Sequence, residues 1–386
     1  MKKKRIILTS ILLVVIISII TIYNELTIIK NSNNKITIKA YINGKLASAP
    51  PSSTDGYKVS NIACTNGATG IFNYSTWRLE MSNVTSNTMC TINFVSNNNT
   101  SFATYLKNKV CSSTPTSDSA AQNCLVNENG YRYEGSDPNN YVLFNNELWR
   151  IIGVFNVQNS AGTSGDLVKL IREEQLDKLS WDGNCKNNWS TATLQTQLNN
   201  GYLNATDTTC NVFNSVNSVT KTCKFSEIGL KLTARNMIES VVWTLGAIGS
   251  SDTPDAMYTA ERGNSVYSGN PLTWTGKVGL MYPSDYGYAV LASNCSRGTK
   301  LSSYNYSSPA CPQNNWLYKY GKQWVLTHIL TSSSEAYQIS FSGEISYMLG
   351  MNSTCTNKSV RPTIYLKSNI KYMSGSGTYS DPYIIS

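Results

Sequence analysis

The ten cysteines are the feature that most limits how this chain can fold. All of them lie beyond residue 63, and their number is even, as a framework of disulfides requires. The chain has no Cys-x-x-Cys motif, so the spacing indicates neither a zinc ribbon nor a thioredoxin-type redox pair. We therefore expect all of the cysteines to pair and the protein to be exported to an oxidising compartment.

Sequence separation indicates which cysteines pair. Cys64 and Cys90 each lie in a strand-like stretch of one short segment, so we expect a bond between them. The short-range pairs that we expect are Cys111 with Cys124, Cys210 with Cys223, and Cys295 with Cys311, which leaves Cys185 for Cys355. In the chain-entropy model, closing loops of this length stabilises a fold by about 3 kcal/mol.

The start of the chain predicts a membrane anchor. Basic residues at 2–5 precede an uncharged run at 6–23, and the run is long enough to span a bilayer as a helix. An Ala-x-Ala cleavage site does not follow, so we interpret residues 6–23 as an uncleaved transmembrane signal anchor; a cleaved signal peptide is the alternative. Residues 1–5 would then be a cytoplasmic tail, with the rest of the chain outside the cell.

Charge and histidine content disfavour several functions. Of the net charge of +9, residues 2–5 supply four, which leaves +9 − 4 = +5 for the remaining residues. No basic cluster is interleaved with aromatic residues, so we expect no nucleic-acid partner. The single histidine, His328, disfavours zinc sites and histidine-activated nucleophiles, and we expect neither a metal nor a cofactor.

Two modules follow the membrane segment. Apolar and polar residues alternate over 36–42 before an Asn43-Gly44 turn, and further strand-like stretches lie at 57–64, 77–81 and 90–94. These predict a small β-sandwich at 30–96. A polar run then opens a linker at 97–128 that carries a short helix from Phe102.

The larger module, 129–386, combines strand and helix signals. Strands are predicted at 141–144, 148–155 and 167–172, and a helix that Ser190 could cap carries Leu194, Leu198 and Tyr202 on one face. The apolar stretch at 238–245 follows it. We therefore predict an α+β fold.

Several motifs of this module resemble a family of bacterial exported domains. They are ELWRIIG at 147–153, NNW at 187–189, VGLMYPSDYGYA at 278–289, WVLT at 324–327 and VRP at 360–362. The family looks like a divergent branch of the C-type-lectin-like and formylglycine-generating-enzyme-like fold group, and the match covers residues 130–372. The resemblance implies a C-type-lectin-like domain with a structural motif formed by Trp149, Arg150, Trp324, Arg361 and Pro362. Residues 35–95 resemble an Ig-like module.

Departures from better-known branches limit what this resemblance implies. The Glu-Pro-Asn or Gln-Pro-Asp motif and the Trp-Asn-Asp motif that bind calcium in sugar-binding C-type lectins are missing. Nothing marks any cysteine as the active pair of a formylglycine-generating enzyme. We therefore expect no calcium-dependent sugar binding and no enzyme activity.

Three residues are candidate ligand contacts: Asp285, Tyr286 and His328. Each has a simpler interpretation, because Asp285 could cap the following helix and a lone histidine in a strand is usually packed. We expect Arg361 to form an ion pair with Glu147 or Glu261. Loops at 246–270 and 294–314 are the candidates for displaying a binding surface.

The sequence favours a membrane-anchored extracellular surface protein with a lectin-like domain that binds a glycan or a surface protein in adhesion or recognition. The alternatives are an envelope-structural protein without a specific ligand and, less favoured, an enzyme of the formylglycine-generating type. An exposed aromatic patch in a concave site would favour the first, and converging carboxylates in a pocket would favour an enzyme. The oligomeric state is not indicated.

Overall fold

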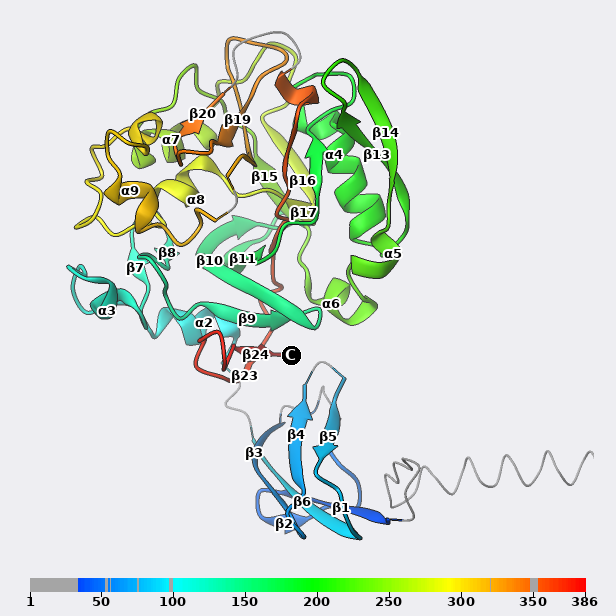
Figure 1. Cartoon of the computed structure of the whole chain (residues 1–386). Coiled ribbons are helices and arrows are strands. Elements are labelled where there is room, and N and C mark those ends of the chain that lie inside the picture. The colour runs from blue at the N-terminus through cyan, green and yellow to red at the C-terminus, as the bar shows by residue number, and fades with distance from the viewer. Residues whose placement is uncertain are drawn as a thin grey trace, which may run out of the picture. The chain divides into compact units, whose positions relative to one another are not determined.

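A computed structural model of the chain describes residues 34–386 apart from 53, 54, 56, 75, 97–99, 320 and 348–352 (Figure 1). The chain divides into two compact units between Thr100 and Ser101. The anchor predicted at 6–23 and the basic tail at 1–5 lie outside the described residues. Within the described residues, no helix has the length and apolar character needed to cross a membrane.

The smaller unit is all β. Its main sheet has the strand order β2-β1-β6-β3, formed by β1 (Ile36–Ile42), β2 (Lys45–Leu46), β3 (Tyr57–Cys64) and β6 (Thr88–Ser96). A hairpin of β4 (Thr69–Asn73) and β5 (Arg78–Ser82) packs on this sheet. Asn43 and Gly44 both have positive φ and form the predicted turn between β1 and β2.

The core of the smaller unit is aromatic and is joined by one disulfide. Phe72 of the hairpin packs edge-on against Phe94 of the sheet, with ring centroids 5.5 Å apart. Cys64 and Cys90 are direct cross-strand partners in β3 and β6 and form the predicted bond. This disulfide therefore links neighbouring strands of one sheet, whereas an Ig-like sandwich joins two facing sheets.

Two sheets organise the larger unit. The first has the order β17-β22-β11-β10-β8-β7, with β9 also paired to β10. Its strands are β7 (Val126–Asn127), β8 (Tyr131–Arg132), β9 (Tyr141–Phe144), β10 (Glu147–Gln158), β11 (Ser164–Arg172), β17 (Val278–Gly279) and β22 (Thr363–Tyr365). The second has the order β12-β21-β18-β19-β20. Its strands are β12 (Lys178–Ser180), β18 (Gln323–His328), β19 (Ala336–Ile339), β20 (Ile345–Ser346) and β21 (Asn357–Ser359).

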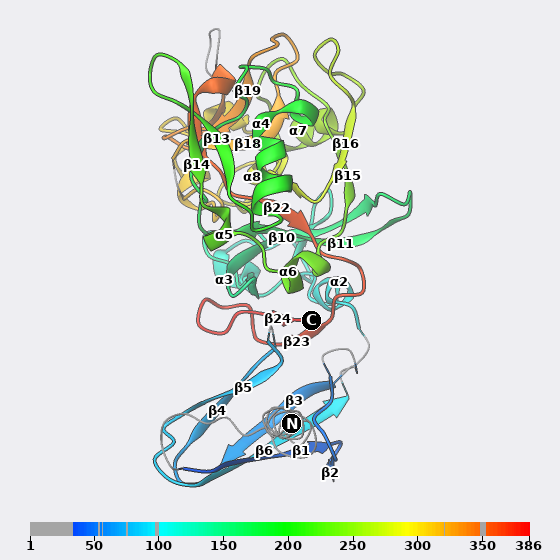
Figure 2. The ribbon, with the colours of Figure 1, turned by 90° about the vertical axis from the view of Figure 1, so that its right-hand side faces the viewer.

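Three two-stranded ribbons surround these sheets. They are β13 (Thr208–Phe213) with β14 (Ser218–Cys223), β15 (Val241–Thr244) with β16 (Thr273–Gly276), and β23 (Tyr372–Ser374) with β24 (Ile384–Ile385). Figures 1 and 2 both show the β13–β14 ribbon beside the α4 helix.

The helices of the larger unit are short. They are α2 (Phe102–Lys107), α3 (Asp118–Ala121), α4 (Thr193–Thr196), α5 (Phe225–Ile228), α6 (Leu232–Met237), α7 (Pro254–Glu261), α8 (Pro283–Gly287) and α9 (Ala310–Gln313). Single turns are η1 (Trp189–Thr191), η3 (Leu301–Ser303) and η4 (Ser353–Cys355), and a π-helical turn, η2 (Gln197–Tyr202), continues α4.

The predicted α+β, C-type-lectin-like fold class is therefore wrong. The structure is mostly β-sheet, with 36% strand against 16% helix, and its strands are divided among many small sheets. The apolar stretch at 238–245 illustrates the difference between prediction and structure. By hydrophobicity alone it could form a helix or a strand, but it contains the strand β15, which buries alternate residues, Val241 and Trp243. The predicted helix with Leu194, Leu198 and Tyr202 does form, and all three side chains are buried.

The cysteines pair as predicted from their spacing. The larger unit contains Cys111–Cys124, Cys185–Cys355, Cys210–Cys223 and Cys295–Cys311, so with Cys64–Cys90 no free cysteine remains. Five disulfides fit an extracellular or secreted protein.

Residues 101–128, predicted as part of a linker, belong instead to the larger unit. Phe102 and Leu106 of α2 are fully buried in its core, because the helix presents apolar residues at i and i+4. Ser101 pairs with Lys371. The residue after Lys371, Tyr372, pairs with Ile385. The first and last segments of the larger unit are thus neighbours.

Candidate functional site

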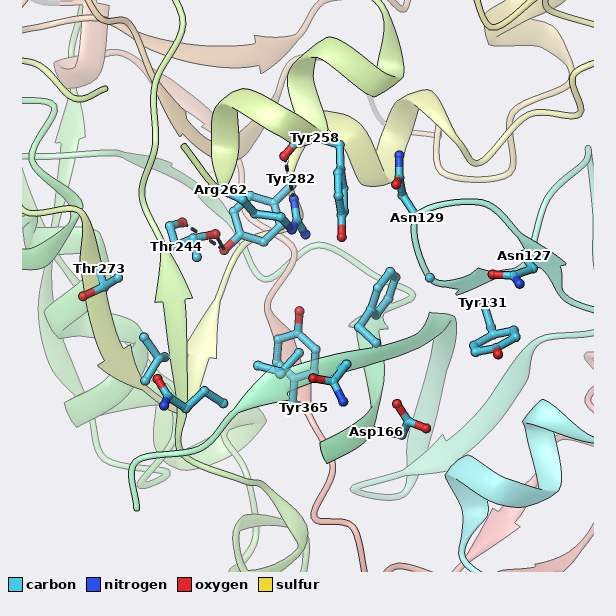
Figure 3. Close-up of a pocket in the computed structure, with 16 residues that line it drawn as sticks. Asn127, Asn129, Tyr131, Asp166, Thr244, Tyr258, Arg262, Thr273, Tyr282 and Tyr365 are labelled. Carbon is cyan, nitrogen blue, oxygen red and sulfur yellow. Dashed lines mark hydrogen bonds between the residues drawn. The ribbon is translucent and has the colours of Figure 1, made fainter. Parts of the chain in front are cut away.

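A pocket of about 520 Å³ lies in the larger unit between the β10–β11 hairpin, the β15–β16 ribbon and α7 (Figure 3). Its floor consists of Phe155, Tyr282 and Tyr365, all of which are almost completely buried. Figure 3 shows Tyr258, Arg262 and Tyr282 together on one side and Asn127, Tyr131 and Asp166 on the other. We call Tyr258 and Arg262 the wall of the pocket. We call Asn127, Tyr131 and Asp166 the rim.

The β7–β8 turn shapes the rim. Asn129 and Gly130 both have positive φ, which lets the chain reverse within two residues. A Cβ atom on Gly130 would lie 2.6 Å from the ring of Phe155, so only glycine allows this turn to pack on the floor. At the rim itself, Lys107 Nζ lies 2.5 Å from Asp166 Oδ2 and 5.0 Å from the ring centre of Tyr131.

Helix α7 positions the wall. The helix begins at Pro254, after Thr253, whose hydroxyl accepts a hydrogen bond from the Ala256 amide. At its other end, Arg262 Nη1 donates to Glu261 Oε2 at 3.0 Å and to the Tyr258 carbonyl at 3.2 Å. The guanidinium carbon also lies 3.6 Å from the centre of the Tyr258 ring. The arginine is therefore held from several sides.

The floor carries two tyrosine hydroxyls, of which one has a partner in the protein. The Tyr282 hydroxyl donates to the Thr244 carbonyl at 2.9 Å. No described residue forms a hydrogen bond with the Tyr365 hydroxyl, although Tyr365 is only 4% exposed and lines the pocket. Burial raises the pKa of Tyr365 well above its usual value, so this hydroxyl stays protonated. A hydroxyl that opens onto a pocket and has no partner in the protein is available to a ligand.

A buried charge cluster of Arg132, Lys169 and Asp285 lies beneath the floor. Lys169 Nζ is 2.5 Å from Asp285 Oδ2, and Arg132 Nη1 is 3.0 Å from Asp285 Oδ1. Burial alone would raise the pKa of Asp285, but the two cations offset it and lower the pKa to about 2. Burial lowers the pKa of Lys169 to about 8 despite the contact with Asp285. Both groups are therefore charged at neutral pH.

Aromatic rings enclose this cluster. Lys169 Nζ lies 4.3 Å from the ring centre of Tyr282 and 5.4 Å from that of Tyr365. Arg132 lies 4.6 Å from the ring centre of Phe155. A cation and the face of an aromatic ring attract each other, so Lys169 and Arg132 help to hold the floor rings in place.

The predicted ligand contacts lie elsewhere in the core. Asp285 caps α8 by accepting a hydrogen bond from the Tyr282 amide at 2.9 Å, in line with its simpler interpretation. Tyr286 is fully buried and its hydroxyl donates to the Gly343 carbonyl. His328 is 2% exposed, accepts a hydrogen bond from the Tyr267 amide, and has a pKa that burial lowers to about 4. None of the three lines the pocket.

The residues of the predicted structural motif are all buried, but in separate contacts. Trp149 and Trp324 donate their indole hydrogens to Glu147 and to the Leu179 carbonyl. Arg150 lies over the ring of Tyr141. The Pro362 carbonyl accepts a hydrogen bond from the Arg172 amide.

The ion pair predicted for Arg361 has a different partner. Arg361 Nη2 lies 3.6 Å from Glu173 Oε2, whereas Glu147 pairs with Arg172 and Glu261 with Arg262. Each of the two predicted partners is already paired with another arginine. Arg361 lies just before β22 and pairs with Glu173, which lies just after β11, the strand that pairs with β22.

The sequence predicts one of the segments that line the pocket, but it does not predict the pocket itself. The loop at 246–270, predicted to display a binding surface, contains α7 and supplies Tyr258 and Arg262. The loop at 294–314 contributes no described lining residue. No local sequence signal distinguishes Tyr365, a floor residue, from any other buried tyrosine. In the described part of the chain, no group of three or more His, Cys, Asp or Glu residues is placed to hold a metal ion.

The comparisons with known proteins add no relative. No protein-family model, no curated protein and no solved structure matches this chain. The resemblance to lectin-like exported domains therefore stays a prediction, and the function has to be argued from the pocket.

Proposed function

We propose that this protein binds glycans outside the cell, with one sugar residue held in the pocket. The observation that carries the proposal is the Tyr365 hydroxyl, which opens onto the pocket from a residue that is only 4% exposed and has no hydrogen-bond partner among the described residues (Figure 3). Water can reach a hydroxyl that opens onto a pocket, and a ligand hydroxyl that replaces this water can form the same hydrogen bond.

The composition of the pocket supports a sugar. Half-buried rings of Tyr131 and Tyr258 stand on opposite sides, and a sugar presents apolar C–H faces that pack on such rings. Asn127, Asn156 and Gln158 add amide groups, which donate to and accept from sugar hydroxyls. The volume of about 520 Å³ lies within the usual range of about 300–1,000 Å³ for small-ligand sites.

The carboxylates favour binding over hydrolysis. Most glycoside hydrolases use two carboxylates that flank the scissile bond. Asp166 is the one carboxylate among the described lining residues, and Lys107 already pairs with it at 2.5 Å. The other nearby acids, Glu261 and Asp285, are buried behind the wall and beneath the floor.

Attachment to the membrane through residues 6–23 is the second part of the proposal. The support is the basic stretch at 2–5 followed by the long uncharged run. In cells that express the full chain, we expect the protein to stay with the membranes after a wash at alkaline pH. Release into the wash would contradict an anchor and favour a secreted form.

The binding test uses the full-length chain, purified in mild detergent with its disulfides formed. We expect saturable binding to a class of glycans on an array and, by calorimetry, to the methyl glycoside of the recognised sugar. Chelating calcium should change neither result, because the proposed contacts need no ion.

Tyr365→Phe removes one oxygen atom and should weaken binding about 10-fold. The matched control is Tyr306→Phe, because Tyr306 is 89% exposed and does not line the pocket. An array without any bound glycan would reject the proposal, and equal affinities for the two variants would reject this pocket as the site.

A further inference from the structure

We propose that the pocket selects sugars that carry a carboxylate, such as uronic and sialic acids, and that Arg262 receives this carboxylate. The inference rests on the proposed function and names the class of sugar. Arg262 is the one cation among the described residues that line the pocket. Its position and the balance of charge around it both point to an acidic ligand.

Arg262 is held rigidly but still has donors to offer. Nη1 makes both of its hydrogen bonds, to Glu261 and to the Tyr258 carbonyl. No described residue accepts from Nε or Nη2, and the side chain is 28% exposed. A guanidinium has five N–H donors in a planar fork that matches a carboxylate. Because stacking on Tyr258 already orders the side chain, a ligand would lose little entropy in engaging it.

The groups behind the pocket carry surplus positive charge. Arg132, Lys169 and Arg262 are cations, and they face two carboxylates, Asp285 and Glu261, so the balance is 3 − 2 = +1. At the rim, Lys107 and Asp166 cancel each other. Charges that are removed from water interact strongly, so a surplus cation favours an anion in the adjacent pocket.

The protonation of Glu261 and the nearby Asp255 also bear on this balance. Burial raises the pKa of Glu261 to about 7, so part of its negative charge is lost near neutral pH and the surplus grows. Asp255 accepts a hydrogen bond from Asn129 of the β7–β8 turn, but Asp255 is exposed, and water screens its charge. The positive surplus therefore stays on the inner side of the pocket, where Arg262 lies.

A pair of ligands that differ only in charge tests the inference on the full-length chain. Calorimetry would compare the methyl glycoside of glucuronic acid with its methyl ester, which has nearly the same shape but no charge, and 3′-sialyllactose with lactose. We expect the acid of the better pair to bind about 10-fold more tightly than its neutral partner.

Arg262→Gln should reduce this preference to about one. Arg262→Lys, which keeps the charge but loses the fork, should retain part of it. Arg235→Gln is the matched control, because Arg235 does not line the pocket. The comparison of acid and ester on the unaltered protein keeps the inference testable even if a variant fails to fold.

The outcomes separate the inference from the proposed function. Equal affinity for acid and ester, with sugar binding intact, would overturn the selectivity and leave glycan binding standing. Absence of all sugar binding would overturn both. If the protein binds an acidic peptide but no sugar, the pocket binds a carboxylate of a protein. This outcome would contradict the proposal of an acidic sugar.

Discussion

Lys169 places its ammonium nitrogen 2.5 Å from Asp285 Oδ2 directly beneath the aromatic floor of the pocket. The two residues are 116 positions apart in the chain, and both side chains are completely shielded from water. Arg132 approaches the same carboxylate from another strand, β8. The ion pair therefore ties the central sheet to the start of α8, and the floor depends on it.

Removing the lysine should destabilise the protein strongly. In Lys169→Met, Asp285 keeps only Arg132 as a charged partner, and breaking a buried pair in this way costs about 3–5 kcal/mol of unfolding free energy. Lys107→Met breaks the partly exposed pair with Asp166 and should cost under about 1 kcal/mol. Urea unfolding of both variants measures the difference. Similar losses would show that Asp285 does not need Lys169.

Glu261 should make stability depend on pH. Burial raises its pKa from 4.5 to about 7, so the folded state holds a proton that the unfolded state releases between these values. Its contribution is therefore complete below about pH 4.5 and is lost as the pH rises through 7, a change on the order of 3 kcal/mol. Glu261→Gln lacks this titration. Unfolding measured at pH 5 and 7.5 should show the variant gaining on the parent as pH rises; a constant difference would contradict the assignment.

Gly130 should be intolerant of any side chain. Gly130→Ala meets positive φ and also places its Cβ against Phe155, which together cost about 2–4 kcal/mol and should weaken ligand binding. Gly162→Ala is the matched control, because Gly162 also has positive φ but its Cβ would meet no atom within 4 Å. Thermal unfolding and calorimetry compare the two. Equal losses would mean that the contact with Phe155 is not restrictive.

The disulfides should differ in what they contribute. Cys185–Cys355 joins residues 170 positions apart, and Cys210–Cys223 joins residues 13 apart. In the chain-entropy model the longer loop gives about 5 kcal/mol and the shorter about 3 kcal/mol. Replacing each pair by serines and measuring urea unfolding tests this order. A larger loss for the short-range pair would show that native contacts outweigh loop entropy here.

Local sequence signals predicted the parts of the fold that depend on local chemistry. The Asn43-Gly44 turn follows from two residues that accept positive φ, and strand β3 coincides with its predicted range. Cysteine spacing was sufficient for all five pairings, since short loops close most easily and one pair then remains.

The fold class and the site depended on contacts that no local signal reports. Trp243 and its neighbours at 238–245 could be helix or strand by hydrophobicity, and pairing with β16 decided in favour of strand. The sequence predicts Asp285 as a candidate ligand contact, because the residue is acidic and lies in a turn-like motif. Only the folded structure shows that Arg132 and Lys169 occupy its oxygens, and that Tyr365 and Arg262 line the pocket instead.

The pairing of Ser101 with Lys371, and of Tyr372 with Ile385, also affects how this unit could be reused in evolution. A unit whose chain enters and leaves at one place can be inserted into a loop of an unrelated protein without separating the host's own strands. Its pocket would travel with it, because the described lining residues all lie within residues 127–365. The pocket could thus be carried by different hosts as part of one inserted unit.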